Sequence, residues 1–236
     1  MKNVSEFYDG YASRQLEANV TRRHNHIMKG LVRFGLKNDQ KVLEIGCGIG
    51  TLTGLLADYL NDGILLANDI SPESIKIAQK RLINYKNIKF ITGNFLDLQT
   101  EMVVDVVVLP DVIEHIPLSE HNFLFQKIQK LLKPGGFVYI NIPNPYYLSW
   151  CIEHKPKILQ IIDQPIYTDL LCKNIYHHGL FIFHLETHSQ WFENDYQSIV
   201  LKRVSDQTEF KELTYIPKSI LKRLLLKIKK KMYGKR

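Results

Sequence analysis

The chain has 236 residues, of which 45% are hydrophobic, and a formal net charge of +7. Its length suits one α/β domain with extensions, large enough to bury most of its apolar surface. The three cysteines show no metal-type spacing and leave one unpaired in any disulfide scheme, which predicts a reducing, cytoplasmic location. The first residues lack a signal-peptide core, and no apolar run approaches the ~20 residues of a membrane-spanning helix.

The first informative segment is Val42-Leu-Glu-Ile-Gly-Cys-Gly-Ile-Gly50. A short apolar run is followed by Gly46, Gly48 and Gly50, and residues 51–60 have the pattern of a helix. Glycine permits positive φ and lets a ligand approach the backbone, while the start of the helix presents amide donors. The segment therefore predicts a site for a small polar molecule, the alternative being a turn that serves only strand-to-helix packing.

Two ligand classes use such a turn, the dinucleotides and S-adenosylmethionine. Dinucleotide sites favour G-x-G-x-x-G, whereas this chain has G-x-G-x-G followed by Thr51. Glu44 would repel a pyrophosphate and attract a cationic ligand. Asp69 ends the next apolar run, where its carboxylate can accept hydrogen bonds from ribose hydroxyls. These features favour the sulfonium cofactor.

Strands and helices continue to alternate after Asp69. Strands are predicted over 89–92, 103–109 and 137–142, a turn over 132–136, and helices over 72–82 and 120–132. The loop 93–97 carries Asn94 and Phe95, which suit an adenine ring. This alternation predicts a parallel sheet with helices on both faces, whose ligands bind at the carboxyl ends of the strands.

In this order and spacing, VLEIGCGIGTLT, LLANDISPESIKIAQKR, FITGNFLDL, DVVVLPDVIEHIP and LLKPGGFVYINIPNP resemble the class I S-adenosylmethionine-dependent methyltransferases. The resemblance covers about residues 40–145 and is strongest to the small-molecule branch, including ubiquinone-biosynthesis-type and sugar methyltransferases. It implies a Rossmann-like seven-stranded, mostly parallel sheet with helices on both faces. To this the chain is predicted to add an insertion after strand five that covers the active site.

The resemblance also implies roles for particular residues. Gly46, Gly48 and Gly50 would hold the methionine part of the cofactor, Asp69 the ribose, and Asn94 with Phe95 the adenine. Many members of the family have Asp where this chain has Asn94, so we expect weakened rather than lost binding. An N-terminal helical lid over residues 1–35, with a helix from Leu16 to Phe34, would close over the cofactor. The further residues assigned to the cofactor site are Tyr11, Glu44, Cys47, Ile70 and Asp111.

Candidate catalytic residues lie after the fourth and fifth strands. His115, in Asp111-Val-Ile-Glu-His, would lie at the mouth of the pocket as a base for a hydroxyl acceptor; the alternative is a structural histidine under the cofactor. Residues 143–190 depart from the shared pattern and are predicted to cover the acceptor, with helical spacing over 155–171. Their histidines offer His178 as a second base or acceptor contact; half-buried structural side chains are the alternative, and no metal site is expected.

The end of the chain carries most of the charge. The last two strands are predicted at 198–204 and 210–216, which would close a methyltransferase domain over 36–216. Residues 211–236 hold ten Lys or Arg and one Glu, and the tail 217–236 has a basic amphipathic pattern. This favours an anionic membrane surface as its partner; a terminal helix packed on its own domain is the alternative, and nucleic acid is disfavoured because the tail offers little for base stacking.

The sequence thus predicts a cytoplasmic methyltransferase, peripheral at the inner face of the membrane if the tail binds lipid. It would methylate a small-molecule acceptor, in the first instance an oxygen of a sugar, quinone precursor or lipid-linked metabolite. The alternatives are a protein or peptide methyltransferase and a non-catalytic cofactor-binding subunit of a methyltransferase complex.

Overall fold

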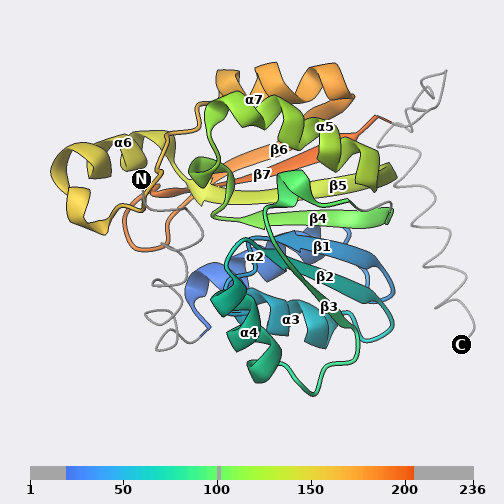
Figure 1. The fold of residues 1–236 in the computed structure, drawn as a ribbon. Coiled ribbons are helices and arrows are strands. Elements are labelled where there is room, and N and C mark those ends of the chain that lie inside the picture. The colour runs from blue at the N-terminus through green and yellow to red at the C-terminus, as the bar shows by residue number, and fades with distance from the viewer. Residues whose placement is uncertain (1–19, 100–101, 205–236) are drawn as a thin grey trace, which may run out of the picture. The chain divides into compact units, whose positions relative to one another are not determined.

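The computed structural model describes residues 20–99 and 102–204, and its centre is a seven-stranded sheet with the order β3-β2-β1-β4-β5-β7-β6 (Figure 1). Neighbouring strands from β3 to β5 pair parallel, and β7 pairs antiparallel with both β5 and β6. This confirms the predicted Rossmann-like, mostly parallel sheet. The strands are β1 Lys41–Ile45, β2 Ile64–Asp69, β3 Ile88–Thr92, β4 Val104–Pro110, β5 Leu132–Pro143, β6 Leu180–His188 and β7 Tyr196–Arg203.

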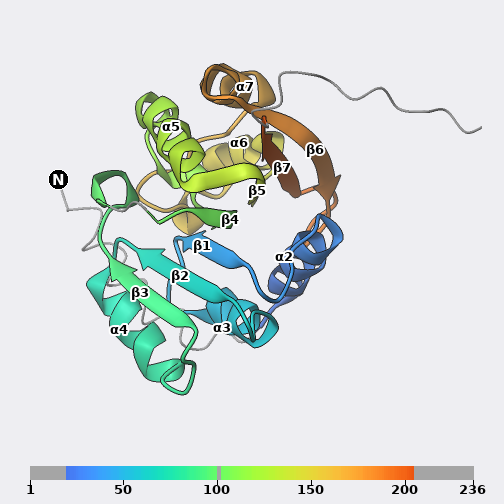
Figure 2. The same cartoon turned by 90° about the vertical axis from the view of Figure 1, so that its right-hand side faces the viewer.

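Helices cover both faces of the sheet (Figure 2), as predicted. Helices α2, α3 and α4 lie on one face and α5 and α7 on the other, while α6 projects beyond the sheet on the left of Figure 1. The α-helices are α2 Arg22–Arg33, α3 Thr51–Tyr59, α4 Pro72–Arg81, α5 His121–Leu131, α6 Pro145–His154 and α7 Thr168–Ile175. Short 3-10 turns are η1 Phe95–Asp97, η2 Ile113–His115, η3 Leu118–Glu120, η4 Pro156–Ile158 and η5 Tyr176–His178.

The two larger hydrophobic cores of the described residues lie on opposite faces of the sheet, because successive side chains of a strand point to opposite faces. In β4, Val107 and Leu109 join the core that also contains Leu124 of α5. Val106 and Val108 join the other core, which contains Leu31 of α2 and Leu56 of α3. The continuous apolar pattern of β4 therefore reflects a strand buried on both faces.

The last strands differ from the prediction. The segment predicted as the sixth strand lies in β7, and β6 is formed by Leu180–His188, which the sequence placed in the insertion. The predicted strand over 210–216 lies outside the described residues. β6 was missed because it is an edge strand with an irregular register between Ile182 and His184 and half-buried side chains.

The region before β6 also differs from its prediction. The helix expected over 155–171 is replaced by η4, an extended stretch and α7, since Pro156 and Pro165 interrupt helical hydrogen bonding. The turn expected over 132–136 is an irregularity within β5, whose register on β4 shifts between Val104 and Val106. Residues 168–188 therefore belong to the sheet and its covering helices rather than to an insertion.

Two further predictions fall outside the described residues, namely the lid contact Tyr11 and the basic tail 217–236. Membrane contact by the tail stays a prediction. Among the helices formed by residues 20–99 and 102–204, none has the length and apolar character needed to cross a bilayer.

Candidate functional site

A cavity of about 280 Å³ lies where β1, β2 and β4 end. Its position at the carboxyl ends of parallel strands is the one expected for a ligand site in such a sheet. It brings together most of the residues that the sequence singled out. Those that line it are Glu44, Gly46, Cys47, Gly48, Asp69, Ile70, Asn94, Phe95, Asp111 and His115.

The glycine turn is held by the end of β2. The amides of Gly46 and Cys47 both donate to the carbonyl of Asn68, at 2.8 and 2.9 Å, and the amide of Gly48 donates to Asp69 Oδ2 at 2.7 Å. Gly46 has φ +77°, and a Cβ there would lie 2.4 Å from Cγ2 of Val112. The turn therefore requires glycine for both its backbone conformation and its close approach to the loop after β4.

Asp69 organises the turn as well as facing the cavity. Its second oxygen, Oδ1, accepts from the amide of Ser71 at 2.9 Å. Each carboxylate oxygen can accept more than one hydrogen bond, so Asp69 can also accept from a ligand hydroxyl. Gly50, by contrast, does not line the cavity; a Cβ there would lie 2.9 Å from Leu82 and 3.1 Å from Ala78, so this third glycine permits the packing of α3 on α4 rather than ligand contact.

Glu44 is a fully buried carboxylate under the turn. Its Oε2 accepts from Thr53 Oγ1 at 2.7 Å, while Oε1 has no hydrogen-bond partner among the described residues. Burial raises the pKa of Glu44 to about 7. The Asp69 carboxylate adds to this increase, and the Thr53 hydrogen bond opposes it. A cationic group in the cavity would stabilise its charged form.

Asn94 and Phe95 lie together after β3, as the sequence predicted. Oδ1 of Asn94 accepts from the amide of Leu96 at 3.1 Å and begins η1. Phe95 is 4% exposed, and the ammonium of Lys127 lies 5.1 Å from its ring centroid. The ring of Phe95 thus packs in the core on the α5 side of the sheet, while Gly93, Asn94 and Phe95 together line this edge of the cavity.

Asp111 faces the cavity from the loop after β4, where its φ is +55°. Its carboxylate forms an ion pair with the guanidinium of Arg23 in α2. Arg23 also lines the cavity; sequence reasoning missed it because its partner is 88 residues away. The pairing ties α2 to the edge of the site.

His115 is held in one orientation by the segment 160–164. Its Nδ1 donates to the carbonyl of Ile162 at 2.7 Å and lies 3.2 Å from Asp163 Oδ1, while Nε2 lies 3.9 Å from Glu114 Oε1. Burial lowers the pKa of His115, but the Glu114 charge and the Asp163 hydrogen bond outweigh it and raise that pKa to about 9. Burial also raises the pKa of Glu114, to about 8.

Residues 160–164 are fastened onto the loop after β4 by several hydrogen bonds. The backbone amide of Gln164 donates to the carbonyl of Glu114 at 3.0 Å, and the side-chain Nε2 of Gln164 donates to the carbonyl of Ile116 at 2.9 Å. Gln160 from this segment lines the cavity beside His115. This part of the predicted acceptor cover therefore reaches the site, although no signal in the sequence marks Gln160 itself.

His178, the second predicted base, does not line the cavity. It lies in η5 and donates from Nε2 to Asn122 Oδ1 of α5 at 2.9 Å, because residues 168–188 belong to the sheet and its helices. His184 contacts Glu186, and His188 contacts Asn141. Within the described ranges no group of three or more His, Cys, Asp or Glu is arranged to hold a metal ion.

Comparisons with known proteins place this site in a family context. Residues 42–136 match the family model described as a methyltransferase domain. Trans-aconitate 2-methyltransferase of Mycobacterium tuberculosis is 32% identical over 114 residues, which are 48% of this chain and 41% of the relative. Sterol 24-C-methyltransferase of Debaryomyces hansenii is 29% identical over 65% of this chain and 40% of the relative. The chain thus spans less than half the length of these relatives.

The fold comparison agrees with the domain match. A crystal structure of a S-adenosylmethionine-dependent methyltransferase from Clostridium acetobutylicum superimposes with a TM-score of 0.64 at 16% identity, covering 84% of this chain and 99% of that one. At this identity the likeness concerns the fold.

Proposed function

We propose, from the premise that this chain carries a class I S-adenosylmethionine-dependent methyltransferase domain, that it transfers a methyl group to an oxygen of a small molecule. The observation that supports an oxygen acceptor is the position of His115, a titratable group that lines the same cavity as the glycine turn. A hydroxyl must lose its proton during methylation, whereas a carboxylate acceptor needs no base.

The residues of the cavity fit the cofactor of this family. Glu44 Oε1 is a buried carboxylate oxygen without a donor among the described residues, which suits a cationic ligand. Asp69 offers acceptor capacity at the end of β2, and Asn94 offers an amide where residues 93–95 line the cavity. Cys47 and Gly48 complete the floor of the same cavity.

When bound, S-adenosylmethionine supplies a methyl group on a sulfonium and leaves as a neutral thioether. The chain's own part is to align the acceptor and to take its proton. Because Nδ1 of His115 donates to the carbonyl of Ile162, Nε2 is the atom that would receive the hydroxyl proton as the new C–O bond forms. Asp163 and Glu114 would stabilise the resulting imidazolium.

The first experiment is calorimetric titration of the full chain with S-adenosylmethionine and its demethylated product, followed by a radiolabelled-methyl screen of soluble and membrane metabolite fractions. We expect binding that Asp69→Ala weakens at least about tenfold, because the variant loses both the ligand acceptor and the support of the turn. Exposed Asp62→Ala is the control. Cofactor binding without transfer to any fraction would favour a non-catalytic subunit instead.

The base role has its own test in the pH profile. Since the pKa of His115 is raised to about 9, the neutral form needed to accept a proton increases as the pH rises through that value. We therefore expect kcat/KM for the acceptor to increase from pH 7 to pH 9. A profile that is flat over this range, and unchanged in His115→Gln, would contradict a base role for this residue.

A further inference from the structure

The loop after β3, residues 93–98, forms one edge of the cavity, and β2 supports its beginning. The side-chain amide of Asn68 donates to the carbonyls of Ile91 and Gly93 at 3.1 and 2.9 Å. The backbone amide of Gly93 donates to the carbonyl of Asp69 at 2.9 Å. All of these contacts lie at or before the first residue of the loop, so the position of η1, which follows, depends on other contacts.

Lys127 of α5 holds the rest of this loop. Its Nζ donates to the carbonyl of Leu96 at 2.8 Å and to the carbonyl of Leu98. The same ammonium lies 5.1 Å from the ring centroid of Phe95. Hydrogen bonds from a charged donor are stronger than those from a neutral one. One side chain thus binds two backbone carbonyls and the aromatic ring of the turn that Asn94 begins.

Helix α5 is a firmly anchored support for this side chain. Leu124, Phe125 and Ile128 of α5 are fully buried in the core of that face of the sheet. At the first residue of the helix, Nε2 of His121 donates to two carbonyls of the loop after β4, at 2.9 and 3.0 Å. Because packing and hydrogen bonds fix the helix, Lys127 reaches η1 from a defined position.

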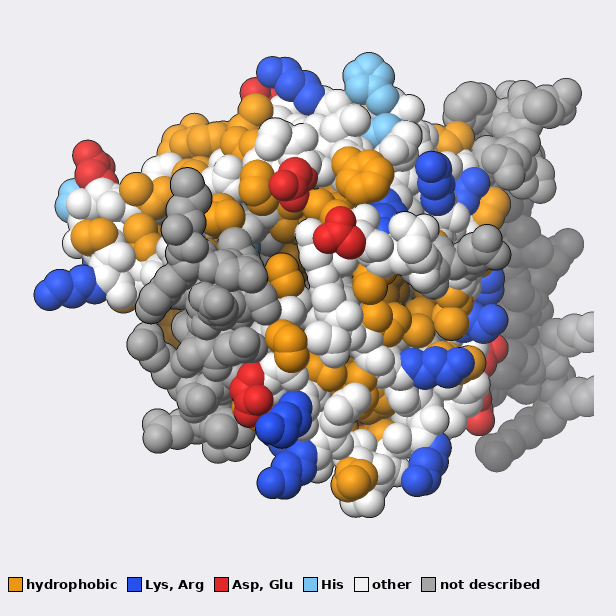
Figure 3. Space-filling view, in the orientation of Figure 1, with side chains coloured by type: hydrophobic (Ala, Val, Ile, Leu, Met, Phe, Trp, Pro, Cys, Tyr) orange, Lys and Arg blue, Asp and Glu red, His pale blue; other side chains and the backbone are white. Residues whose placement is uncertain are grey.

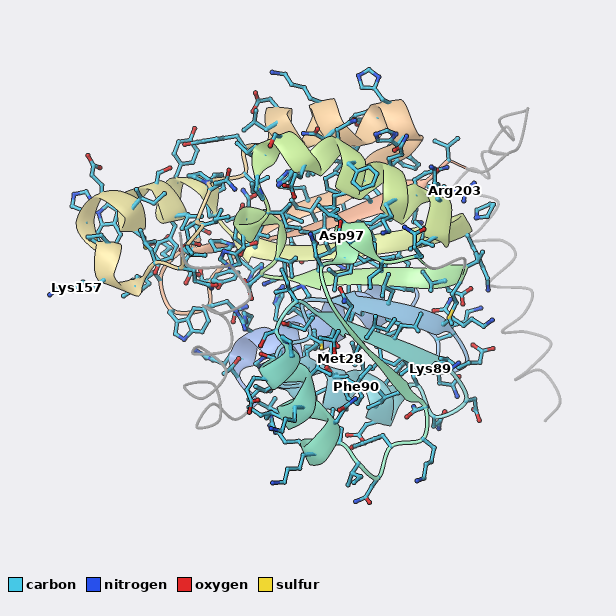
Figure 4. The ribbon with its side chains drawn as sticks, viewed as in Figure 1. Met28, Lys89, Phe90, Asp97, Lys157 and Arg203 are labelled. Carbon is cyan, nitrogen blue, oxygen red and sulfur yellow. The ribbon has the colours of Figure 1, made fainter. Side chains whose placement is uncertain are left out.

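The charges around Lys127 favour a role within the chain. Asp97 of η1 is labelled near the centre of Figure 4, below α5. Burial lowers the pKa of Lys127, and the Asp97 charge opposes this by stabilising the ammonium. In Figure 3 charged side chains of both signs are spread over this face of the described residues, with no large basic patch. A polyanionic partner would be indicated by such a patch, whereas Lys127 has acceptors of its own.

The position of η1 decides where the side-chain amide of Asn94 lies. Oδ1 of Asn94 accepts from the backbone amide of Leu96 at 3.1 Å, and the carbonyl of Leu96 accepts from Lys127. An amide oxygen can accept a second hydrogen bond, which suits the amino group of adenine. Because such a bond requires donor and acceptor within about 3.2 Å, a small displacement of η1 would lose it.

We propose that Lys127 is a positioning residue for the adenine end of the cofactor site. It holds η1 so that Oδ1 of Asn94 accepts from the adenine amino group. Lys127 does not line the cavity, so it acts through residues 94–98 and not by touching the cofactor. This inference rests on the proposed function, because it takes the cofactor to bind in this cavity.

The test is calorimetric titration of the full chain with S-adenosylhomocysteine and with S-inosylhomocysteine, which carries an oxygen in place of the adenine amino group. We expect Lys127→Met to weaken binding of the adenosyl compound about tenfold, the effect of one lost hydrogen bond, and of the inosyl compound less than about threefold. Lys127→Arg keeps a charged donor and should bring the adenosyl affinity to within about threefold of the wild type. Lys130→Met, exposed on the same helix, is the matched control and should bind both compounds as the wild type does.

Some results would overturn the inference while leaving the proposed function intact. These are an unchanged affinity of Lys127→Met for S-adenosylhomocysteine, equal weakening of the two compounds in this variant, or no recovery of affinity in Lys127→Arg. Failure of the wild type to bind S-adenosylhomocysteine would instead count against the proposed function. Circular dichroism shows whether each variant is folded, and Lys127→Gln, which keeps a neutral donor, replaces Lys127→Met if that variant is not.

Discussion

The cavity has two walls that are built in different ways. One wall, which we propose holds the cofactor and call the cofactor wall, is formed by the turn after β1 and the end of β2, where Gly48 donates to Asp69 across 21 residues of sequence. The other, which we propose faces the methyl acceptor and call the acceptor wall, joins the loop after β4 to the segment 160–164, where His115 donates to Ile162 across 47 residues. The first wall follows from local strand, turn and helix geometry, whereas the second depends on how two distant segments pack.

Gly46 lies where the two walls meet, and its substitution should have the largest effect. A Cβ at this position would approach Cγ2 of Val112 to 2.4 Å, on a residue with φ +77°. We expect Gly46→Ala to lower the free energy of unfolding by roughly 2–5 kcal/mol, from backbone strain plus overpacking, and to weaken cofactor binding at least about tenfold. Urea denaturation and calorimetric titration measure the two effects.

Gly135 supplies the matched control for this variant. Its φ is +78°, nearly the same as that of Gly46, but no atom of the described residues lies within 4 Å of the position that a Cβ would take. Gly135→Ala should therefore show only the strain of a positive φ, about 1 kcal/mol. Equal losses of stability in the two variants would mean that the contact with Val112 does not couple the walls.

Burial of Glu44 makes the free energy of unfolding depend on pH. The pKa of its carboxyl is about 7 in the folded protein against an ordinary value of 4.5, so the unfolded chain loses this proton first. Stability therefore falls as the pH rises from 4.5 to 7, and the full cost is present above pH 7. Comparing urea unfolding at pH 5 and pH 8, we expect Glu44→Gln to reduce the stability difference between the two pH values by roughly 2–3 kcal/mol.

The same variant separates stability from ligand binding. Gln lacks the negative charge that would attract a cationic cofactor, so Glu44→Gln should bind S-adenosylmethionine more weakly even where its stability at pH 8 is higher. Thr53→Val is the comparison, since it removes the hydroxyl that donates to Glu44 and keeps the charge. An unchanged pH dependence in Glu44→Gln would show that another group is responsible.

The contrast between the walls also explains what could be predicted from the sequence. The strands up to β5, the glycine turn, Asp69 and Asn94 follow from patterns within about 30 residues, and the structure places them as expected. Arg23 and Gln160 could not be found this way, because nothing near them in sequence marks their partners. His178 was misplaced because β6 lacks the continuous apolar run of a central strand, so its segment has the sequence pattern of an insertion.

Asp163 tests whether the acceptor wall sets the charge state of His115. Its hydrogen bond is one cause that holds the pKa of His115 at about 9. We expect Asp163→Asn to lower this pKa toward the ordinary value of 6.5, because the amide stabilises the imidazolium less than a carboxylate does. NMR titration of the His115 ring, assigned with His115→Gln, measures the change.

The raised pKa of His115 also makes the stability of the protein depend on pH. A histidine whose folded pKa is raised stabilises the protein fully below its unfolded pKa of 6.5, and that contribution is lost as the pH rises through about 9. In Asp163→Asn, the stability lost as His115 deprotonates should be smaller than in the wild type, and this loss should be complete at a lower pH. An unaltered titration midpoint would mean that Glu114 and the Ile162 carbonyl, and not Asp163, keep the pKa of His115 raised.

The smallest effect is expected at Asn94, on the cofactor wall. Its Oδ1 accepts from the amide of Leu96, a hydrogen bond that a carboxylate can also accept, so Asn94→Asp should preserve η1. A charged acceptor forms stronger hydrogen bonds than an amide, and we expect the variant to bind S-adenosylmethionine about two- to fivefold more tightly. Exposed Asn61→Asp, in the turn between α3 and β2, adds the same charge away from the cavity and should change affinity little. Weaker binding in Asn94→Asp would indicate that the amide donates to the ligand through its NH₂ group instead of accepting through its oxygen.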